Sequence, residues 1–261
     1  MTDAPAEPFP DTLPTAIPAA TLVVFRDRAA GPPELLLVER AKAMAFAGGA
    51  LVFPGGRVDP GDHALAALLD RGDDETAARI AAIRETIEEA GLPVGLSPIP
   101  SVDAFERLRT ALHAGTAFGQ ALADAGTRID RDALTYFARW RPAHAHARIF
   151  DTRFYLARLP IDAPAPRVDA TENVRLFWAT AAEVLAEADA GRATIIFPTR
   201  RNLERLAGFA DFATAVADAS TYPIRTVTPW TEQRDGIEHL CIPDDLGYPV
   251  TSEPMSDAVR G

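Results

Sequence analysis

Three glutamates, Glu85, Glu88 and Glu89, are grouped with one cation, Arg84, in the segment "IRETIEEAG" (Ile83–Gly91). In an α-helix, spacings of three and four residues place all three carboxylates on one face. Like charges at these spacings repel each other and destabilise a helix. One interpretation is a solvated acidic surface in which Arg84 pairs with Glu88. The other is a site for Mg²⁺ or Mn²⁺, hard cations that prefer carboxylate oxygens.

A helix over residues 73–91 must position these carboxylates. Asp73 or Asp74 can cap its N-terminus, and Gly91 suits its C-terminal stop. The apolar residues of this segment that recur at helical spacing lie opposite the glutamates; they are Ile80, Ile83 and Ile87. One side of the predicted helix is therefore suited to a core and the other to charge.

The segment "LVFPGGRVDPGD" (Leu51–Asp62) precedes this helix and reads as a strand followed by a Pro-Gly-Gly turn. Glycines in such a turn let the backbone approach a ligand closely. Together with "RETIEEAGL" (Arg84–Leu92), and with Gly56 as the opening glycine, this resembles the Nudix box. On these motifs the chain is identified as a member of the Nudix hydrolase superfamily.

The resemblance implies an α/β (α+β) Nudix fold, in which a mixed β-sheet is sandwiched between helices. It also implies metal-dependent hydrolysis of a diphosphate, with Glu85, Glu88 and Glu89 as ligands of Mg²⁺ or Mn²⁺. Metal catalysis of this kind activates the attacking water and stabilises charge on the leaving phosphate. Arg84 is a further catalytic candidate. The base differs among family members, and here it could be Glu88, Glu89 or a later acid. The later candidate is Glu172, in "TENVRLFW", because it resembles a family glutamate that precedes a strand with Trp.

The box is interrupted in this sequence. The usual box has a further glutamate shortly after its glycine, and here that place falls on Asp62, far upstream of Arg84. If the usual spacing is instead counted back from Arg84, the position of this glutamate falls beside Glu75. Either acid could complete the box by pairing with Arg84.

A second resemblance concerns the substrate. The segment "LLVERAKAMAFAGGALVFPGG" (Leu36–Gly56) is similar to a motif of Nudix coenzyme A diphosphatases, although Ala45 stands where the family has a second arginine. The interrupted box and the later segments resemble the animal peroxisomal type of this subgroup and its bacterial relatives. This implies coenzyme A or acyl-coenzyme A as substrate, with 3′,5′-ADP and (acyl-)4′-phosphopantetheine as products. The substrate-binding candidates are Arg40, Gly55, Gly56 and Arg153.

Two alternatives remain open at this point. The chain could be a Nudix diphosphatase for ADP-ribose, NADH or another dinucleotide, or a non-catalytic module that senses a nucleotide. Trp140 could stack on an adenine or belong to the core. The remaining cations near the motifs are interpreted as surface charges; they are Lys42, Arg57, Arg200 and Arg201.

The other elements suggest one Nudix domain over 20–249, between a flexible Pro/Ala-rich tail (1–19) and a C-terminal tail (250–261). A helical insertion is expected at about 101–140, and a C-terminal extension from about 198. The predicted strands are 21–25, 34–40, 50–53, 148–159 and 174–179. The predicted helices are 101–126 (one or two), 130–138, 180–191, 202–208 and 209–220, with short strands after them.

Composition limits the partners. The net charge of −11 and pI of about 4.9 argue against binding nucleic acid or an anionic membrane, both of which require clustered Lys and Arg. No apolar run reaches the length of a membrane span. The single cysteine, Cys241, excludes an internal disulfide and is interpreted as a core residue. We therefore expect a cytoplasmic protein, monomeric or homodimeric, whose partner is a small-molecule substrate.

Overall fold

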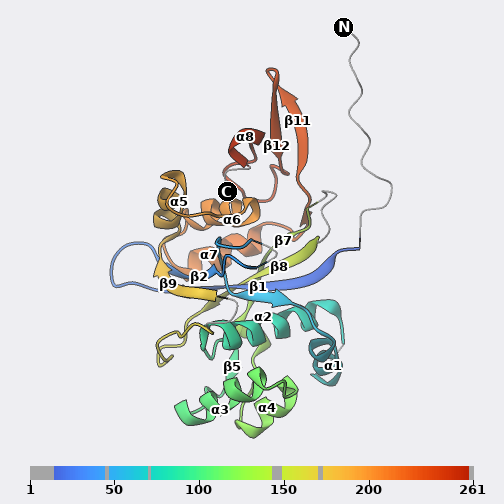
Figure 1. Cartoon of the computed structure of the whole chain (residues 1–261), viewed down its shortest axis with the longest axis vertical. Helices are drawn as coiled ribbons and strands as arrows, with labels where there is room; N and C mark the ends of the chain where they lie inside the picture. The colour runs from blue at the N-terminus through green and yellow to red at the C-terminus, as the bar shows by residue number, and fades with distance from the viewer. Residues whose placement is uncertain (1–14, 45–46, 70–71, 143–148, 170–172, 259–261) are drawn as a thin grey trace.

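The computed structural model describes residues 15–44, 47–69, 72–142, 149–169 and 173–258 (Figure 1). Its main sheet is mixed and is centred on β1 (Ile17–Arg26), which pairs in parallel with β8 and antiparallel with β2 and β4. The other strands lie outward from these in the order β10-β7-β8-β1-β2-β3, with β9 also beside β2. Their bounds are β2 (Glu34–Arg40), β3 (Leu51–Val52), β4 (Gly55–Arg57), β7 (Thr135–Trp140), β8 (Phe150–Arg158), β9 (Asn173–Ala179) and β10 (Thr226–Val227).

The central strand shows why this sheet is covered on both faces. Leu22, Val23, Val24 and Phe25 are consecutive apolar residues of β1, and all four are fully buried. Because successive side chains of a strand point to opposite faces, such a run requires a core on each side. Leu22 and Val24 pack in one core cluster, and Val23 and Phe25 pack in the other.

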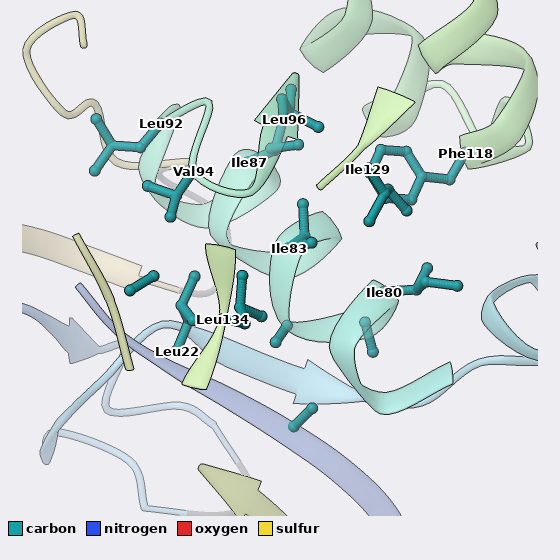
Figure 2. Packing of buried hydrophobic residues seen from close by; sticks show 14 of the residues in the cluster. Leu22, Ile80, Ile83, Ile87, Leu92, Val94, Leu96, Phe118, Ile129 and Leu134 are labelled. Atoms are coloured by element: carbon teal, nitrogen blue, oxygen red, sulfur yellow. The ribbon is translucent and has the colours of Figure 1, made fainter. Parts of the chain in front are cut away.

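The first core cluster lies between the sheet and a helical layer drawn below it in Figure 1. This layer consists of α1 (Pro60–Leu69), α2 (Asp74–Ala90), α3 (Val102–His113) and α4 (Phe118–Asp124). Ile80, Ile83 and Ile87 of α2 are fully buried in it (Figure 2). Burying one such side chain contributes about 1.5–3 kcal/mol, so the apolar face of α2 holds this helix against the sheet.

The second core cluster lies under the helices on the opposite face, α5 (Ala181–Asp189), α6 (Phe197–Leu206) and α7 (Phe212–Thr221). Thr180 caps α5 with a capping box that also uses Glu183. Leu203 and Leu206 of α6 pack in the same cluster as Phe25. The described chain therefore has the predicted architecture, a mixed sheet between two helical layers.

Smaller elements complete the described structure. The strands β5 (Leu96–Ser97) and β6 (Arg128–Ile129) pair at the base of the α3–α4 insertion. A second sheet is formed by β11 (Trp230–Arg234), β12 (Ile237–Cys241) and β13 (Ser252–Pro254), and α8 (Met255–Ala258) follows it. Cys241 is fully buried, as the sequence predicts. In the described part of the chain, no helix has the length and apolar character needed to cross a membrane.

The predicted helix at 130–138 is wrong. Only Arg131–Ala133 forms a short 3₁₀ helix (η1), and Thr135–Trp140 forms strand β7 of the main sheet. The aromatic residues Tyr136, Phe137 and Trp140 favour a strand, and Tyr136 and Trp140 pair with β8 on either side of a register shift at Phe137. The helical insertion therefore ends with α4, before residue 140.

Other boundaries also differ from the expectations. Helix α1 was not predicted, and it occupies the interruption of the box. Strand β1 begins at Ile17, within the expected N-terminal tail, and helix α6 begins at Phe197, before the predicted residue 202. The expected C-terminal tail contains β13 and α8. These differences arise because local sequence signals do not include distant partners. Pairing with distant strands and packing on a core extend the elements beyond the limits that their own propensity predicts.

Candidate active site

Helix α2, whose spacing places the glutamates along one face, is fixed at both of its ends. The side chain of Asp73 accepts a hydrogen bond from the N–H of Thr76 (2.7 Å) at the N-terminus. At the C-terminus, Gly91 has a φ of 64° and its N–H donates to the carbonyl of Ile87 (3.0 Å). The predicted helix and its caps are confirmed.

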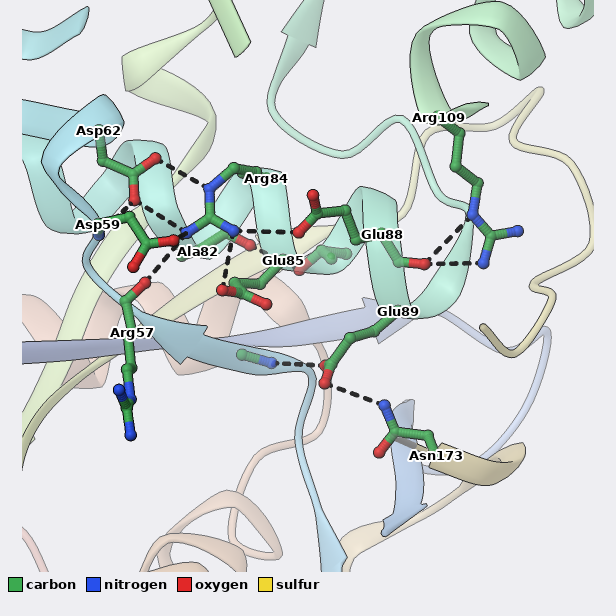
Figure 3. A network of polar contacts seen from close by, with 12 residues as sticks. Arg57, Asp59, Asp62, Ala82, Arg84, Glu85, Glu88, Glu89, Arg109 and Asn173 are labelled. Carbon is green, nitrogen blue, oxygen red and sulfur yellow. Dashed lines mark hydrogen bonds and ion pairs between the residues drawn. The ribbon is translucent and has the colours of Figure 1, made fainter. Parts of the chain in front are cut away.

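Arg84 connects the two halves of the interrupted box (Figure 3). It donates from Nε to Oδ1 of Asp62 (3.0 Å) and from Nη2 to Oδ2 (2.9 Å), the bidentate geometry that favours arginine. Its Nη1 also donates to Glu85 (2.9 Å) and Glu88 (3.0 Å). Glu75 instead accepts a hydrogen bond from Arg79 (3.0 Å). The acid that pairs with Arg84 across the break is therefore Asp62, which is 1% exposed.

Glu89 is held by donors from two other elements. Its Oε2 accepts the backbone N–H of Gly55 (2.9 Å), and its Oε1 accepts Nδ2 of Asn173 (2.9 Å) (Figure 3). Glu89 and Asn173 are both buried. The helix, the glycine turn and the start of β9 thus meet at this one carboxylate.

Burial sets the electrostatics of these acids. It raises the pKa of Glu85 to about 8, against the opposing charge of Arg84. It also raises the pKa of Glu89 to about 7, against the hydrogen bonds from Asn173 and Gly55, and it raises the pKa of Glu88. A buried carboxylate without sufficient positive charge favours its neutral form, so the site would gain from a cation.

Gly55 and Gly56 allow the turn to approach both β1 and the acidic face. A Cβ at Gly56 would lie 2.4 Å from the carboxylate of Glu85. A Cβ at Gly55 would lie 2.4 Å from the backbone oxygen of Ala20 on β1. Only glycine fits these positions without displacing the backbone or Glu85.

A cleft of about 480 Å³ opens beside the glycine turn and Glu85, within the range of about 300–1,000 Å³ that is usual for small-molecule sites. Arg40 and Arg57 contribute positive charge to it. Its remaining lining is mostly apolar and includes Val52, Phe53, Trp140, Ile149, Phe150, Phe154, Ile196 and Pro198. The cleft can therefore accept an anionic group next to an apolar or flat one.

The donor set on α2 suits a hard divalent cation, since it supplies carboxylate oxygens alone. As the side chains stand, no three acidic, histidine or cysteine groups of the described residues converge closely enough to hold a metal. Glu85 and Glu88 are turned toward Arg84, and Glu89 is turned toward Gly55 and Asn173. Metal binding would therefore require a rearrangement of these glutamate side chains.

Comparison with known proteins shows the family of this chain. A family model described as NUDIX domain matches residues 16–197, more than half of the chain. The chain belongs to the Nudix family. A crystal structure of a NUDIX hydrolase from Alicyclobacillus acidocaldarius is 28% identical to it, with a TM-score of 0.67 over 78% of this chain and 96% of that one. This Nudix chain is a hydrolase of the pyrophosphatase type, and Nudix hydrolases generally use divalent metals such as Mg²⁺ or Mn²⁺.

Two other solved structures are more distantly similar. The NUDIX domain of Shewanella oneidensis NrtR, complexed with ADP ribose, is 14% identical with a TM-score of 0.41, over 73% of this chain and 85% of that one. A C. elegans Ap4A hydrolase in a binary complex is 18% identical with a TM-score of 0.38, over 79% and 96% of the two chains.

The candidate site brings together most of the residues singled out in the sequence. Arg40, Gly55, Gly56 and Glu85 line the cleft. Glu88 and Glu89 lie on the same helix, with Glu88 bonded to Arg84 and Glu89 bonded to Gly55 and Asn173. Glu172 lies outside the described residues, as does Ala45, whose position the second substrate motif concerns.

Arg153 lies apart from this site. Its neighbours on β8, Thr152 and Phe154, line the cleft, but Arg153 itself does not. Its Nε lies 3.5 Å from Glu75 of α2, on the opposite face of the sheet. Alternation along the strand therefore directs Arg153 away from the cleft.

Two residues at the candidate site were not selected from the sequence. Arg57 lines the cleft although it was interpreted as a surface charge, and its position directly after the glycine turn was the available signal. Asn173 follows Glu172 at the start of β9, and nothing in its local sequence indicates a contact with Glu89. Lys42 and Arg200 are not among the cleft residues, and Arg201 is buried against Glu204 and Glu253.

Proposed function

We propose that this Nudix hydrolase cleaves the diphosphate linkage of coenzyme A or acyl-coenzyme A, giving 3′,5′-ADP and 4′-phosphopantetheine or its acyl form. The observation that carries the proposal is the position of the acidic face of α2, directly beside a cleft that contains Arg40 and Arg57. The sequence motif that ends in Gly55 and Gly56 supports coenzyme A as the substrate.

In the proposed reaction, water attacks one phosphorus, the bond from that phosphorus to the bridging oxygen breaks, and the second phosphate leaves with that oxygen. Glu85, Glu88 and Glu89 would hold Mg²⁺ or Mn²⁺, which neutralises the diphosphate and lowers the pKa of the attacking water. Gly55 and Gly56 leave room for the substrate to approach. The guanidinium groups of Arg40 and Arg57 would bind the phosphate oxygens.

The test is a hydrolysis screen with Mn²⁺ over coenzyme A, an acyl-coenzyme A, ADP-ribose and NADH, with products identified by mass spectrometry. We expect 3′,5′-ADP from the coenzyme A substrates. Cleavage of ADP-ribose or NADH alone would reject coenzyme A as the substrate while leaving the hydrolase assignment in place.

Glu88→Gln tests the metal site within the same screen. Mutation of a residue that hydrogen-bonds to a metal ligand typically lowers activity about tenfold to a hundredfold. Loss of a metal ligand itself should lower kcat by more than this. Glu75→Gln is the matched control, because Glu75 lies on the same helix but pairs with Arg79. Equal activity of Glu88→Gln and Glu75→Gln would contradict the metal assignment.

A further inference from the structure

The C-terminal end of α2, next to Glu88 and Glu89, is held by an arginine of the helical insertion. Arg109 of α3 donates from Nε (3.2 Å) and Nη2 (2.8 Å) to the backbone carbonyl of Glu88 (Figure 3). The last carbonyls of a helix have no partner within it, so each requires one from elsewhere. Arg109 is 8% exposed, so its guanidinium makes this contact in a largely dry environment.

The same guanidinium reaches a second segment. Nη2 of Arg109 also donates to the carbonyl of Arg167 (2.8 Å), in the loop between β8 and β9. The N–H of Arg167 in turn donates to the carbonyl of Ala90 at the end of α2 (2.8 Å). The side chain of Arg167 forms an ion pair with Glu106 of α3. Helix α3, the end of α2 and this loop are thus joined at one point.

The same loop also contacts the start of β9 through Asp169. Oδ1 of Asp169 accepts the backbone N–H of Asn173 (3.2 Å), and Nδ2 of Asn173 donates to Glu89 (2.9 Å). Contacts therefore join Arg109 to the loop at Arg167, and the same loop, at Asp169, to the start of β9 that holds Glu89. A second contact of Arg109 holds the backbone of Glu88.

The end of α2 is shaped to admit the guanidinium. Gly91 has a positive φ, and a Cβ at this position would lie 2.8 Å from Nη1 of Arg109. Glycine here ends the helix and also leaves space for the arginine. A lysine could supply a charge at the negative end of the helix dipole, but it could not donate in a planar fork to two carbonyls.

We propose that Arg109 is a positioning residue for the metal-binding carboxylates: it fixes the end of α2 relative to the loop that precedes Asn173 and β9, and so holds Glu88 and Glu89 in their binding arrangement. This gives the α3–α4 insertion a role in the site. The inference rests on the proposed function, because it takes Glu88 and Glu89 as metal ligands.

The test compares Arg109→Gln with Arg79→Gln. Arg79 is also an arginine that ties α2 to backbone carbonyls, those of Arg131 and Leu134, but it lies in the N-terminal half of the helix. We would measure the dissociation constant of Mn²⁺ by isothermal titration calorimetry, the Tm, and kcat and KM separately. Arg109→Gln should weaken Mn²⁺ binding about tenfold or more and lower kcat, with KM unchanged. Arg79→Gln should lower Tm without weakening Mn²⁺ binding.

Unchanged Mn²⁺ affinity in Arg109→Gln, or an equal loss in Arg79→Gln, would overturn the proposal. If Arg109→Gln does not fold, Arg109→Lys decides the question: weaker Mn²⁺ binding by the folded lysine variant supports the positioning role, and unchanged binding rejects it. If the unaltered protein binds Mn²⁺ no better than Glu88→Gln does, the proposed function fails instead, which is a separate outcome.

Discussion

Arg84 shows at the scale of single residues how the acidic face is tolerated. It bonds Asp62, Glu85 and Glu88 with one guanidinium, and its side chain is 11% exposed. Without it, the buried carboxylate of Asp62 would lack its charged partner, and breaking such a buried pair costs about 3–5 kcal/mol. Arg84 therefore stabilises the fold and offsets the charge of two proposed metal ligands.

The raised pKa values of Glu85 and Glu89 predict how pH acts on the site. Burial places them at about 8 and about 7, above the values in the unfolded chain. The folded protein thus binds these protons more tightly, so their contribution to stability is full at low pH and is lost as the pH rises through 7 and 8. A divalent cation favours the ionised forms. We expect the increase in Tm caused by Mg²⁺ to grow as the pH rises from about 6 to about 8.

Thermal unfolding with and without Mg²⁺ across this pH range measures the effect. Glu85→Gln removes one of the titrating groups and should make the Tm of the metal-free protein less dependent on pH. An increase in Tm that is the same at every pH would contradict this assignment of the coupled protons.

At the scale of elements, the capping residues and the apolar period of helix α2 predict both of its ends. Asp73→Ala should lower the free energy of unfolding by about 1 kcal/mol, because the N–H of Thr76 loses its acceptor. The cap lies several turns before Glu85, so we expect kcat to be unchanged. Urea denaturation and steady-state kinetics measure the two effects.

Asp211→Ala is the matched control for this cap. Asp211 accepts the N–H of Thr214 (2.8 Å) at the N-terminus of α7, on the opposite face of the sheet. Its replacement should cost a similar free energy. A loss of activity in Asp73→Ala without one in Asp211→Ala would show that the first turn of α2 also acts on the site.

Helix α2 and strand β7 differ in whether the residues that determine their conformation are near or far in the sequence. The period of the isoleucines and the capping residues of α2 are local, so its extent could be predicted. Strand β7 has a mixed local pattern, and pairing with β8 decides its conformation. For such elements the sequence predicts the type of structure less well, because a distant partner contributes its hydrogen bonds.

At the scale of the whole molecule, residues that follow the family match, which ends at residue 197, complete the second core cluster. Nε1 of Trp140 donates to the hydroxyl of Tyr248 (2.9 Å), which donates to Oδ1 of Asn202 (3.1 Å). Trp140 lines the cleft and is 1% exposed. This buried chain of hydrogen bonds connects the main sheet, helix α6 and the C-terminal region.

Tyr248→Phe should lower the free energy of unfolding by about 1–3 kcal/mol, since it leaves the Trp140 N–H and the Asn202 oxygen without this partner. Tyr155→Phe is the control. Tyr155 is fully buried, and its hydroxyl has no hydrogen-bond partner in the described structure, so its loss should be neutral or stabilising. Equal destabilisation by both substitutions in urea denaturation would contradict the role given to the Tyr248 hydroxyl.

The sequence by itself determined the helix that carries the glutamates, the glycine turn, the strand at Glu34–Arg40 and the family. Periodicity, capping and motif spacing act between near neighbours and can be read along the chain. Only the tertiary structure decided that Asp62 pairs with Arg84, that Asn173 holds Glu89 and that Arg153 faces away from the cleft. These contacts join residues far apart in sequence. They form because packing on both faces of the sheet sets the distance and orientation of segments whose local patterns carry no information about each other.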